Sequence, residues 1–135
     1  MCFNLRKSAR AITQMYEEAL TPTGLRATQF SLLVATRLMS TTTINQLAKA
    51  LVMDRTTLTR NIKPLEKQGL LRVTPGKDDR REREVTLTGS GQTILEKALP
   101  LWKEVQKDVK KELGQDRFDR LLHDLSTTVE IAQTE

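Results

Sequence analysis

One stretch of the sequence, residues 54–88, limits the folds open to this chain more than any other. Its first half repeats apolar residues at the spacing of one helix face, namely Leu58, Ile62 and Leu65. Asp54 precedes this stripe, where a carboxylate can accept hydrogen bonds from the free amides of a first helical turn. Gly69 follows it, where the left-handed end of a helix favours glycine. These signals predict a helix over about residues 54–69.

Two short strands and a charged turn are predicted directly after this helix. Residues 71–74 and 85–88 alternate apolar and polar side chains, as short strands do. The turn between them, residues 75–84, carries four basic side chains: Lys77, Arg80, Arg81 and Arg83. A helix followed by a basic hairpin predicts a winged helix-turn-helix, a fold suited to binding duplex DNA.

The rest of the chain consists of amphipathic helical patterns. Apolar residues recur three or four apart in five further segments: 2–20, 27–39, 43–51, 89–113 and 117–132. The short third helix, with Thr43 as its candidate cap, and the tight link into the helix at residue 54 form the helix-turn-helix pattern. We therefore expect a mainly α fold with about six helices and a small β-hairpin wing.

Three residues carry more specific expectations. The segment 27–39 is apolar nearly all round, and Leu38 is one of its apolar residues, which predicts a central, buried helix. Pro100 lies inside the long segment 89–113, where we expect it to bend the helix without breaking it. Asp116 is expected to cap the last helix.

The whole chain, residues 1–135, is expected to form a single domain. A winged helix-turn-helix core over about 25–90 can fold compactly, yet the helices over about 2–20 and 89–133 still carry apolar faces. We expect those faces to pack against one another and against a second copy of the chain. A homodimer also suits DNA recognition, because two recognition helices about 34 Å apart read half-sites one helical turn apart.

The outward face of the helix over residues 54–69 is the candidate DNA-reading surface. It combines short hydroxyls with long cations: Arg55, Thr56, Thr57, Thr59, Arg60 and Lys63. Arginine can bond two acceptors of guanine, and threonine can touch a thymine methyl or a phosphate. A solvated polar face is the alternative interpretation, but the absence of acidic residues from 55 to 65 favours DNA contact.

The basic turn is the second candidate DNA-contacting element. An arginine at a wing tip can insert into a narrow, A·T-rich minor groove. The neighbouring acids oppose simple attraction to phosphate, so we expect a specific role for one of them. A carboxylate two residues before an arginine can pair with it, as Asp79 and Arg81 are placed to do, and can hold the guanidinium in one orientation. The alternative is a flexible charged loop.

Composition excludes several other classes of protein. The 22 Lys and Arg exceed the 17 Asp and Glu, and this basic excess is compatible with a polyanionic partner. A single cysteine, Cys2, and a single histidine, His123, exclude a disulfide framework, a zinc cluster and a multi-histidine metal site. There is no glycine-rich phosphate loop, so we expect no enzyme activity, cofactor or metal. No apolar run reaches the ~18 residues that span a bilayer, which predicts a cytoplasmic protein without a membrane partner.

The wing and its flanking helices resemble the MarR family of dimeric winged helix-turn-helix regulators. The wing pattern of that family is present as Asp79, Arg81, Val85, Leu87, Thr88 and Gly91. Residues 58–60, 65–66 and 69–70 resemble its recognition helix, and residues 28–33 resemble its second helix. The resemblance implies a homodimer joined by the terminal helices, a pseudo-palindromic operator, minor-groove contact by Arg81, and release by a ligand or an oxidant. Repression is the family default. Arg26 departs from the pattern, because the family often has a capping Thr or Ser there.

Two triggers for release remain open at this point. The residues around Cys2 resemble the peroxide-sensing branch of the family, where tyrosines of the partner subunit bond to the oxidised cysteine, and Tyr16 matches one of these tyrosines. A small aromatic or acidic ligand is the expected trigger, and its candidate contacts are Arg6, Arg10, Met15 and Trp102. A winged helix that binds DNA without sequence preference is a further alternative.

Overall fold

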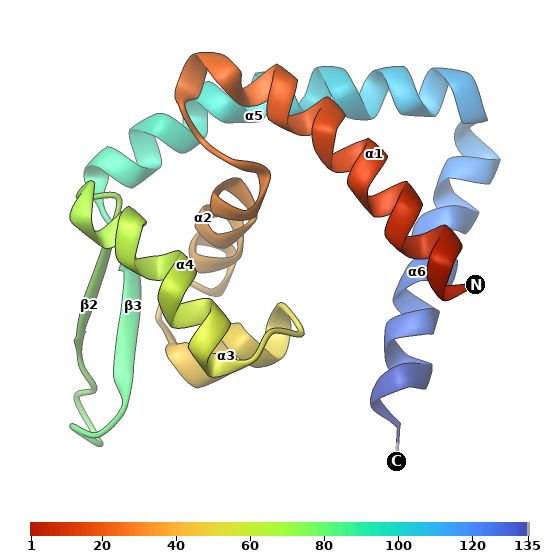
Figure 1. The fold of residues 1–135 in the computed structure, drawn as a ribbon. Coiled ribbons are helices and arrows are strands. Elements are labelled where there is room, and N and C mark those ends of the chain that lie inside the picture. Colours follow the sequence, from red (N-terminus) through yellow and green to blue (C-terminus); the bar gives the residue numbers. More distant parts are fainter. Residues whose placement is uncertain (135) are drawn as a thin grey trace.

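The computed structural model describes residues 1–134, and this part of the chain is mainly helical (Figure 1). The helices are α1 (Cys2–Leu20), α2 (Ala27–Met39), α3 (Ile44–Ala50), α4 (Arg55–Lys67), α5 (Gly89–Leu113) and α6 (Gln115–Gln133). The short η1 (Thr21–Thr23) is a 3-10 turn. The strands are β1 (Thr42–Thr43), β2 (Leu71–Pro75) and β3 (Arg83–Leu87). The mainly α fold with a hairpin wing is therefore confirmed.

The three strands form one small antiparallel sheet in the order β1-β3-β2. Val85 is fully buried in the central strand, opposite Thr42 on one side and Val73 on the other. β1 anchors the wing to the start of α3, because Thr43 both pairs with Glu84 of β3 and caps α3. The β2–β3 hairpin extends beyond β1, so the end of the wing stands away from the rest of the sheet (Figure 1).

The core lies inside a compact lobe made of α2, α3, α4 and the sheet, closed by the first half of α5. Its fully buried large side chains come from each of these elements, for example Leu33, Leu47, Leu58, Leu65, Val85 and Leu95. Burying each such side chain contributes roughly 1.5–3 kcal/mol. The lobe therefore holds α4 rigidly by its apolar face and leaves the opposite face free.

Side-chain caps fix where three helices of the lobe begin. Thr43 accepts a hydrogen bond from the N–H of Gln46, and Thr88 accepts one from the N–H of Gly91. At the start of α4, the side chain of Asp54 accepts a hydrogen bond from the N–H of Thr57. Each cap satisfies an amide that would otherwise have no partner in the first helical turn. The predicted starts of α3 and α4 are thus confirmed.

The remaining helices form an arm that leaves the lobe. α5 runs out of the lobe beside α1, and α6 turns back from its far end (Figure 1). Of the described side chains in α6, Phe118 is the buried one, and a row of apolar residues stays exposed: Leu121, Leu122, Leu125, Val129 and Ile131. The arm therefore carries an apolar face that one protomer does not cover.

Two of the more specific expectations are wrong. Leu38 is 78% exposed, because it lies near the end of α2 on the side that faces away from the lobe's core, although α2 buries Phe30, Leu32 and Leu33 as predicted. Asp116 does not cap α6, because the helix begins one residue earlier, at Gln115, with Gly114 preceding it at a positive φ. Pro100 lies inside an unbroken α5, which bends along its length in Figure 1.

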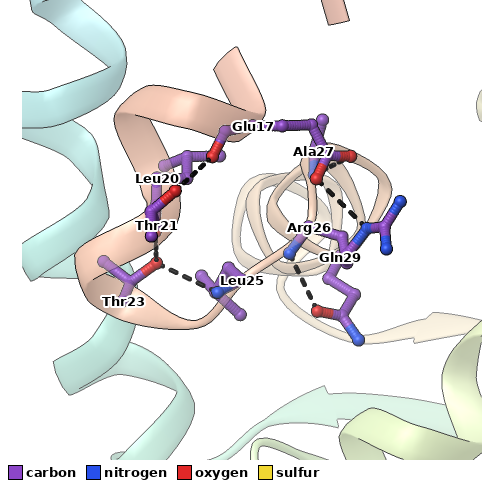
Figure 2. Close-up of polar contacts among 8 residues, drawn as sticks. All are labelled: Glu17, Leu20, Thr21, Thr23, Leu25, Arg26, Ala27 and Gln29. Atoms are coloured by element: carbon purple, nitrogen blue, oxygen red, sulfur yellow. Dashed lines mark hydrogen bonds and ion pairs between the residues drawn. The ribbon is translucent and has the colours of Figure 1, made fainter. Parts of the chain in front are cut away.

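The start of α2 is stabilised from outside the helix. Arg26 occupies the N-cap position, and its side chain cannot accept a bond from an amide because a guanidinium only donates. Glu17 of α1 instead approaches Arg26 and the N–H of Ala27 (Figure 2). Gln29 accepts a further bond from the N–H of Arg26. The helix therefore begins at residue 27, as predicted, despite the unusual residue before it.

Candidate nucleic-acid interface

The outward face of α4 brings together five of the predicted DNA-contacting residues. They line one open groove of about 370 Å³: Arg55, Thr56, Thr59, Arg60 and Lys63. Their spacing places them on one side of the helix, opposite the buried Leu58, Ile62 and Leu65. The hydroxyls lie among three cations, and the first acid of the helix is Glu66 in its last turn. This surface can meet both phosphates and base edges.

Thr57 lies apart from this groove, in the cap of the helix. Its N–H and its hydroxyl each donate to a different oxygen of the Asp54 carboxylate, both at 2.8 Å. These hydrogen bonds, the backbone N–H of Thr57 foremost, hold the pKa of Asp54 below its ordinary value of 3.8. Asp54 and Thr57 therefore set the orientation of the first turn that carries Arg55 and Thr56.

The wing presents Arg81 at its tip with Asp79 beside it. The side chain of Arg81 is 93% exposed, and one oxygen of Asp79 accepts bonds from its backbone N–H at 3.0 Å and its Nε at 3.4 Å. The predicted pairing is therefore present, and it leaves the terminal nitrogens of the guanidinium free to bind elsewhere. The other three basic residues of the wing are also exposed: Lys77, Arg80 and Arg83.

The tip is a tight turn and not an open loop. The N–H of Gly76 donates to the carbonyl of Glu82 at 2.8 Å, and the N–H of Glu82 donates to the carbonyl of Asp79 at 3.1 Å. A side chain at Gly76 would overlap the carbonyl oxygen of Asp79. The turn therefore fixes the place from which Arg81 extends.

α4 and the wing point in the same direction. In Figure 1 the N-terminal end of α4 and the tip of the β2–β3 hairpin lie at the end of the lobe opposite α5. A duplex approaching that end would meet the helix and the wing together, as a winged helix-turn-helix requires.

The candidate ligand residues are dispersed. Arg10 lines an open groove of about 480 Å³ with Ala9, Thr13, Gln14, Glu17 and Arg26. Arg6 and Met15 lie on exposed parts of α1. Trp102 packs between two other rings, with centroids 6.0 Å from Phe30 and 6.3 Å from Tyr16, so it belongs to the packing between helices.

The structure gives no support to the peroxide-sensing pair. Cys2 is exposed in the first turn of α1. The Tyr16 hydroxyl donates to Gln106 of α5 in the same protomer, and burial raises its pKa. Its hydroxyl is therefore already engaged, and we do not favour this alternative.

Sequence reasoning missed Glu17 and Gln106, which join α1 to α2 and to α5. The signal for Glu17 was indirect: Arg26 cannot cap α2, so its cap had to come from elsewhere in the chain. Within residues 1–134 no cluster of three metal-ligating side chains occurs. Over the same residues, no helix is both long and apolar enough to cross a bilayer.

Comparison with known proteins agrees with this geometry. A model described as the MarR family matches residues 25–83. The chain is 30% identical to an organic hydroperoxide resistance transcriptional regulator of Bacillus subtilis over 101 residues, which is 75% of this chain and 69% of that protein. It is 28% identical to the HTH-type transcriptional regulator SarZ of Staphylococcus haemolyticus over 129 residues, covering 96% and 86% of the two chains.

Two solved complexes with DNA are similar over nearly the whole chain. The M. tuberculosis transcriptional regulator MosR in complex with DNA matches with a TM-score of 0.85 and 38% identity, covering 99% of this chain and 98% of the other. A mutant of E. coli MarR complexed with operator DNA matches with a TM-score of 0.85 and 26% identity, covering 92% and 89%. This chain belongs to the MarR family of DNA-binding transcriptional regulators.

Proposed function

We propose that this regulator is a repressor that binds a pseudo-palindromic operator as a homodimer and is released by a small ligand. The observation that carries the proposal is the groove on α4, where Arg55, Arg60 and Lys63 alternate with two threonines on one rigid, outward face. A surface of this kind suits the donors and acceptors in the major groove. Because its target is DNA, we place the protein in the cytoplasm.

The two DNA-contacting elements would divide the work of recognition. α4 would enter the major groove with its N-terminal half, where the helix dipole also favours phosphate. Arg81 would enter the adjacent minor groove, oriented by Asp79 at 3.4 Å. The other wing cations would contact phosphates and contribute affinity without sequence preference.

The uncovered apolar face of the arm supports the homodimer. Leu122, Leu125 and Val129 are each about 40–50% exposed along α6, and Phe3 and Ile12 are exposed along α1. Helices in proteins are stabilised mainly by packing of their apolar face, so the exposed face of α6 needs a surface to pack against. A second copy of the chain offers a matching one through two-fold symmetry.

The ligand would be a small acid. In the groove on α1, Arg26 is paired with Glu17, while Arg10 lies near an apolar Ala9, so a carboxylate could pair with the guanidinium of Arg10. Of the predicted ligand contacts, Arg10 therefore has the most support from the geometry. We expect Arg10→Ala to weaken release by an aromatic acid while leaving operator affinity in its absence unchanged. Equal release of Arg10→Ala and the parent would refute this assignment.

A competition assay tests the DNA-binding proposal against a winged helix that binds without sequence preference. The labelled duplex is the region upstream of the chain's own gene, and unlabelled competitors are the same duplex and an unrelated one of equal length. We expect the unlabelled upstream duplex to compete at a concentration at least about 10³-fold lower than the unrelated duplex, which is the usual minimum specificity ratio. Binding should also fall steeply with salt, because phosphate contacts release counterions. Equal competition by both duplexes would refute sequence-specific regulation.

A further inference from the structure

Glu17 joins the arm to the lobe through a contact that lies outside the two DNA-contacting elements, α4 and the wing. Its Oε2 lies 3.1 Å from Nε of Arg26, and its Oε1 accepts a hydrogen bond from the N–H of Ala27 at 3.3 Å (Figure 2). The carboxylate thus caps α2 from α1, ten residues away in sequence. The side chain of Glu17 is 27% exposed and that of Arg26 is 74% exposed, so water weakens the ion pair on the arginine side and the bond to the N–H of Ala27 gives the contact its direction.

The short connection between α1 and α2 is itself held in one shape. The hydroxyl of Thr21 donates to the carbonyl of Glu17 at 3.1 Å, and the hydroxyl of Thr23 donates to that of Leu20 at 2.7 Å (Figure 2). Thr23 also accepts from the N–H of Leu25 at 3.1 Å. Leu20 and Leu25 are buried on either side of the turn. This segment therefore cannot act as a flexible linker.

The lobe is attached to the arm through the continuous α5, through the ordered η1 turn, and through side-chain contacts between α1 and α2. α5 is continuous from the lobe into the arm, and by itself it would let the lobe twist and bend about one helix. The Glu17 contact adds a directional attachment between α1 and the start of α2. The stacked rings of Tyr16, Trp102 and Phe30 fill the space between these helices. Among these attachments, Glu17 is the one that binds the first residues of α2 directly, so it restricts the direction in which α2 leaves the turn.

We infer that Glu17 is a positioning residue, which sets the angle of the lobe on the arm and thereby the spacing of half-sites that the protein accepts. The inference rests on the proposed homodimer, in which the two arms join and each carries one lobe. A small change in this angle produces a large displacement. α1 has 19 residues and is about 28 Å long. If the lobe turns by about 7° relative to α1 at the Glu17 contact, the N-terminal end of α1 moves by about 3.4 Å relative to the lobe. This displacement equals one base-pair step.

The test is a series of duplexes that carry two selected half-sites whose separation changes by one base pair at a time. The full chain is titrated against each, together with a duplex that carries one half-site. We expect the parent to prefer one spacing by about tenfold over its neighbours, and Glu17→Ala to reduce that preference below about threefold, within the usual range of coupling. Glu18→Ala is the matched control, because Glu18 is exposed in the same turn, and it should behave as the parent.

A double variant separates positioning from stability. Glu17→Ala also removes the cap of α2, so its melting temperature should fall. In Glu17→Ala/Arg26→Ser, the serine can cap α2 locally, which should restore the melting temperature but leave no contact between α1 and α2. We expect this variant to keep the weakened spacing preference and the parent's affinity for one half-site.

Two results would overturn the inference while leaving the proposed function intact. Glu17→Ala could keep the parent's spacing preference, or the double variant could regain that preference with its stability; either shows that Glu17 only stabilises α2. A parent without any preferred spacing would also overturn the inference, and a parent that binds as a monomer would overturn it together with the homodimer on which it rests.

Discussion

At the scale of single residues, Arg81 and Asp79 show how a carboxylate can serve DNA binding although its charge opposes it. Asp79 uses one oxygen to accept from both the backbone N–H and Nε of Arg81, so it restricts the side chain before DNA arrives. Restricting a long side chain in advance lowers the entropy that binding must overcome. We therefore expect substitutions of Arg81 and of Asp79 to affect the same property, the preference for A·T pairs at the edge of each half-site.

Arg81→Ala should weaken operator binding by about 1–3 kcal/mol and remove a preference for A·T pairs at the outer edge of each half-site. Asp79→Ala should reduce the same preference by a smaller amount, because the guanidinium remains but is no longer oriented. Fluorescence anisotropy on duplexes with A·T or G·C pairs at that edge measures both effects. Arg72→Ala, at the base of the hairpin, is the charge-matched control. An unchanged preference in Arg81→Ala would refute the assignment of the wing.

The hydrogen bonds that Asp54 accepts from Thr57 predict how the stability of the protein changes with pH. The pKa of Asp54 in the folded protein is held below 3.8, chiefly by the N–H of Thr57. Its contribution to stability is therefore fully present above the unfolded value and is lost as the pH falls through the folded pKa. Asp54→Asn keeps a capping oxygen without a titrating charge. Its melting temperature should fall less than the parent's as the pH is lowered below about 4. Parallel curves for the two proteins would contradict this role.

At the scale of elements, Gly91 explains how closely the start of α5 packs against the backbone at Leu70, just before β2. A Cβ at this position would overlap the carbonyl oxygen of Leu70 and press on the side chain of Leu87. The contact with backbone cannot relax as a flexible side chain could. Gly91 therefore permits the close approach by which α5 closes the core beside the wing.

Gly91→Ala should lower the free energy of unfolding by about 1–3 kcal/mol, the usual cost of overpacking. Gly89→Ala is the matched control two residues earlier, where an added Cβ meets nothing within 4 Å. That variant should be neutral or slightly stabilising, because alanine favours a helix over glycine by about 1 kcal/mol. Urea titrations of both variants test the difference. Equal stabilities of the two variants would show that the close approach does not matter.

The elements that could be predicted from the sequence are those specified by local signals. The bounds of α4 follow from Asp54, Gly69 and the apolar stripe, and the pairing of Asp79 with Arg81 follows from a separation of two residues. Glu17 could not be predicted as a cap because its partner is ten residues away around a turn. Leu38 was placed wrongly because periodicity alone does not show where a helix end leaves the core.

At the scale of the whole molecule, the exposed face of α6 should decide the oligomeric state. Leu125→Glu would place a charge in the proposed dimer interface, and an unpaired charge buried there is costly. We expect a protein of about 15 kDa by analytical ultracentrifugation, half the mass of the parent, with operator affinity reduced to that for one half-site. His123→Glu adds the same charge on the other side of α6 and should remain a dimer. A dimeric Leu125→Glu would contradict the proposed interface.

In the proposed homodimer, two recognition helices held at a fixed spacing read a specific DNA sequence. Selecting bound duplexes from a random pool tests this proposal most directly, because the experiment assumes neither the sequence nor the spacing. We predict an enriched site with two inverted half-sites whose centres lie about one helical turn, or ~34 Å, apart. A selected pool with no enriched sequence, or with one half-site that is not repeated, would contradict it.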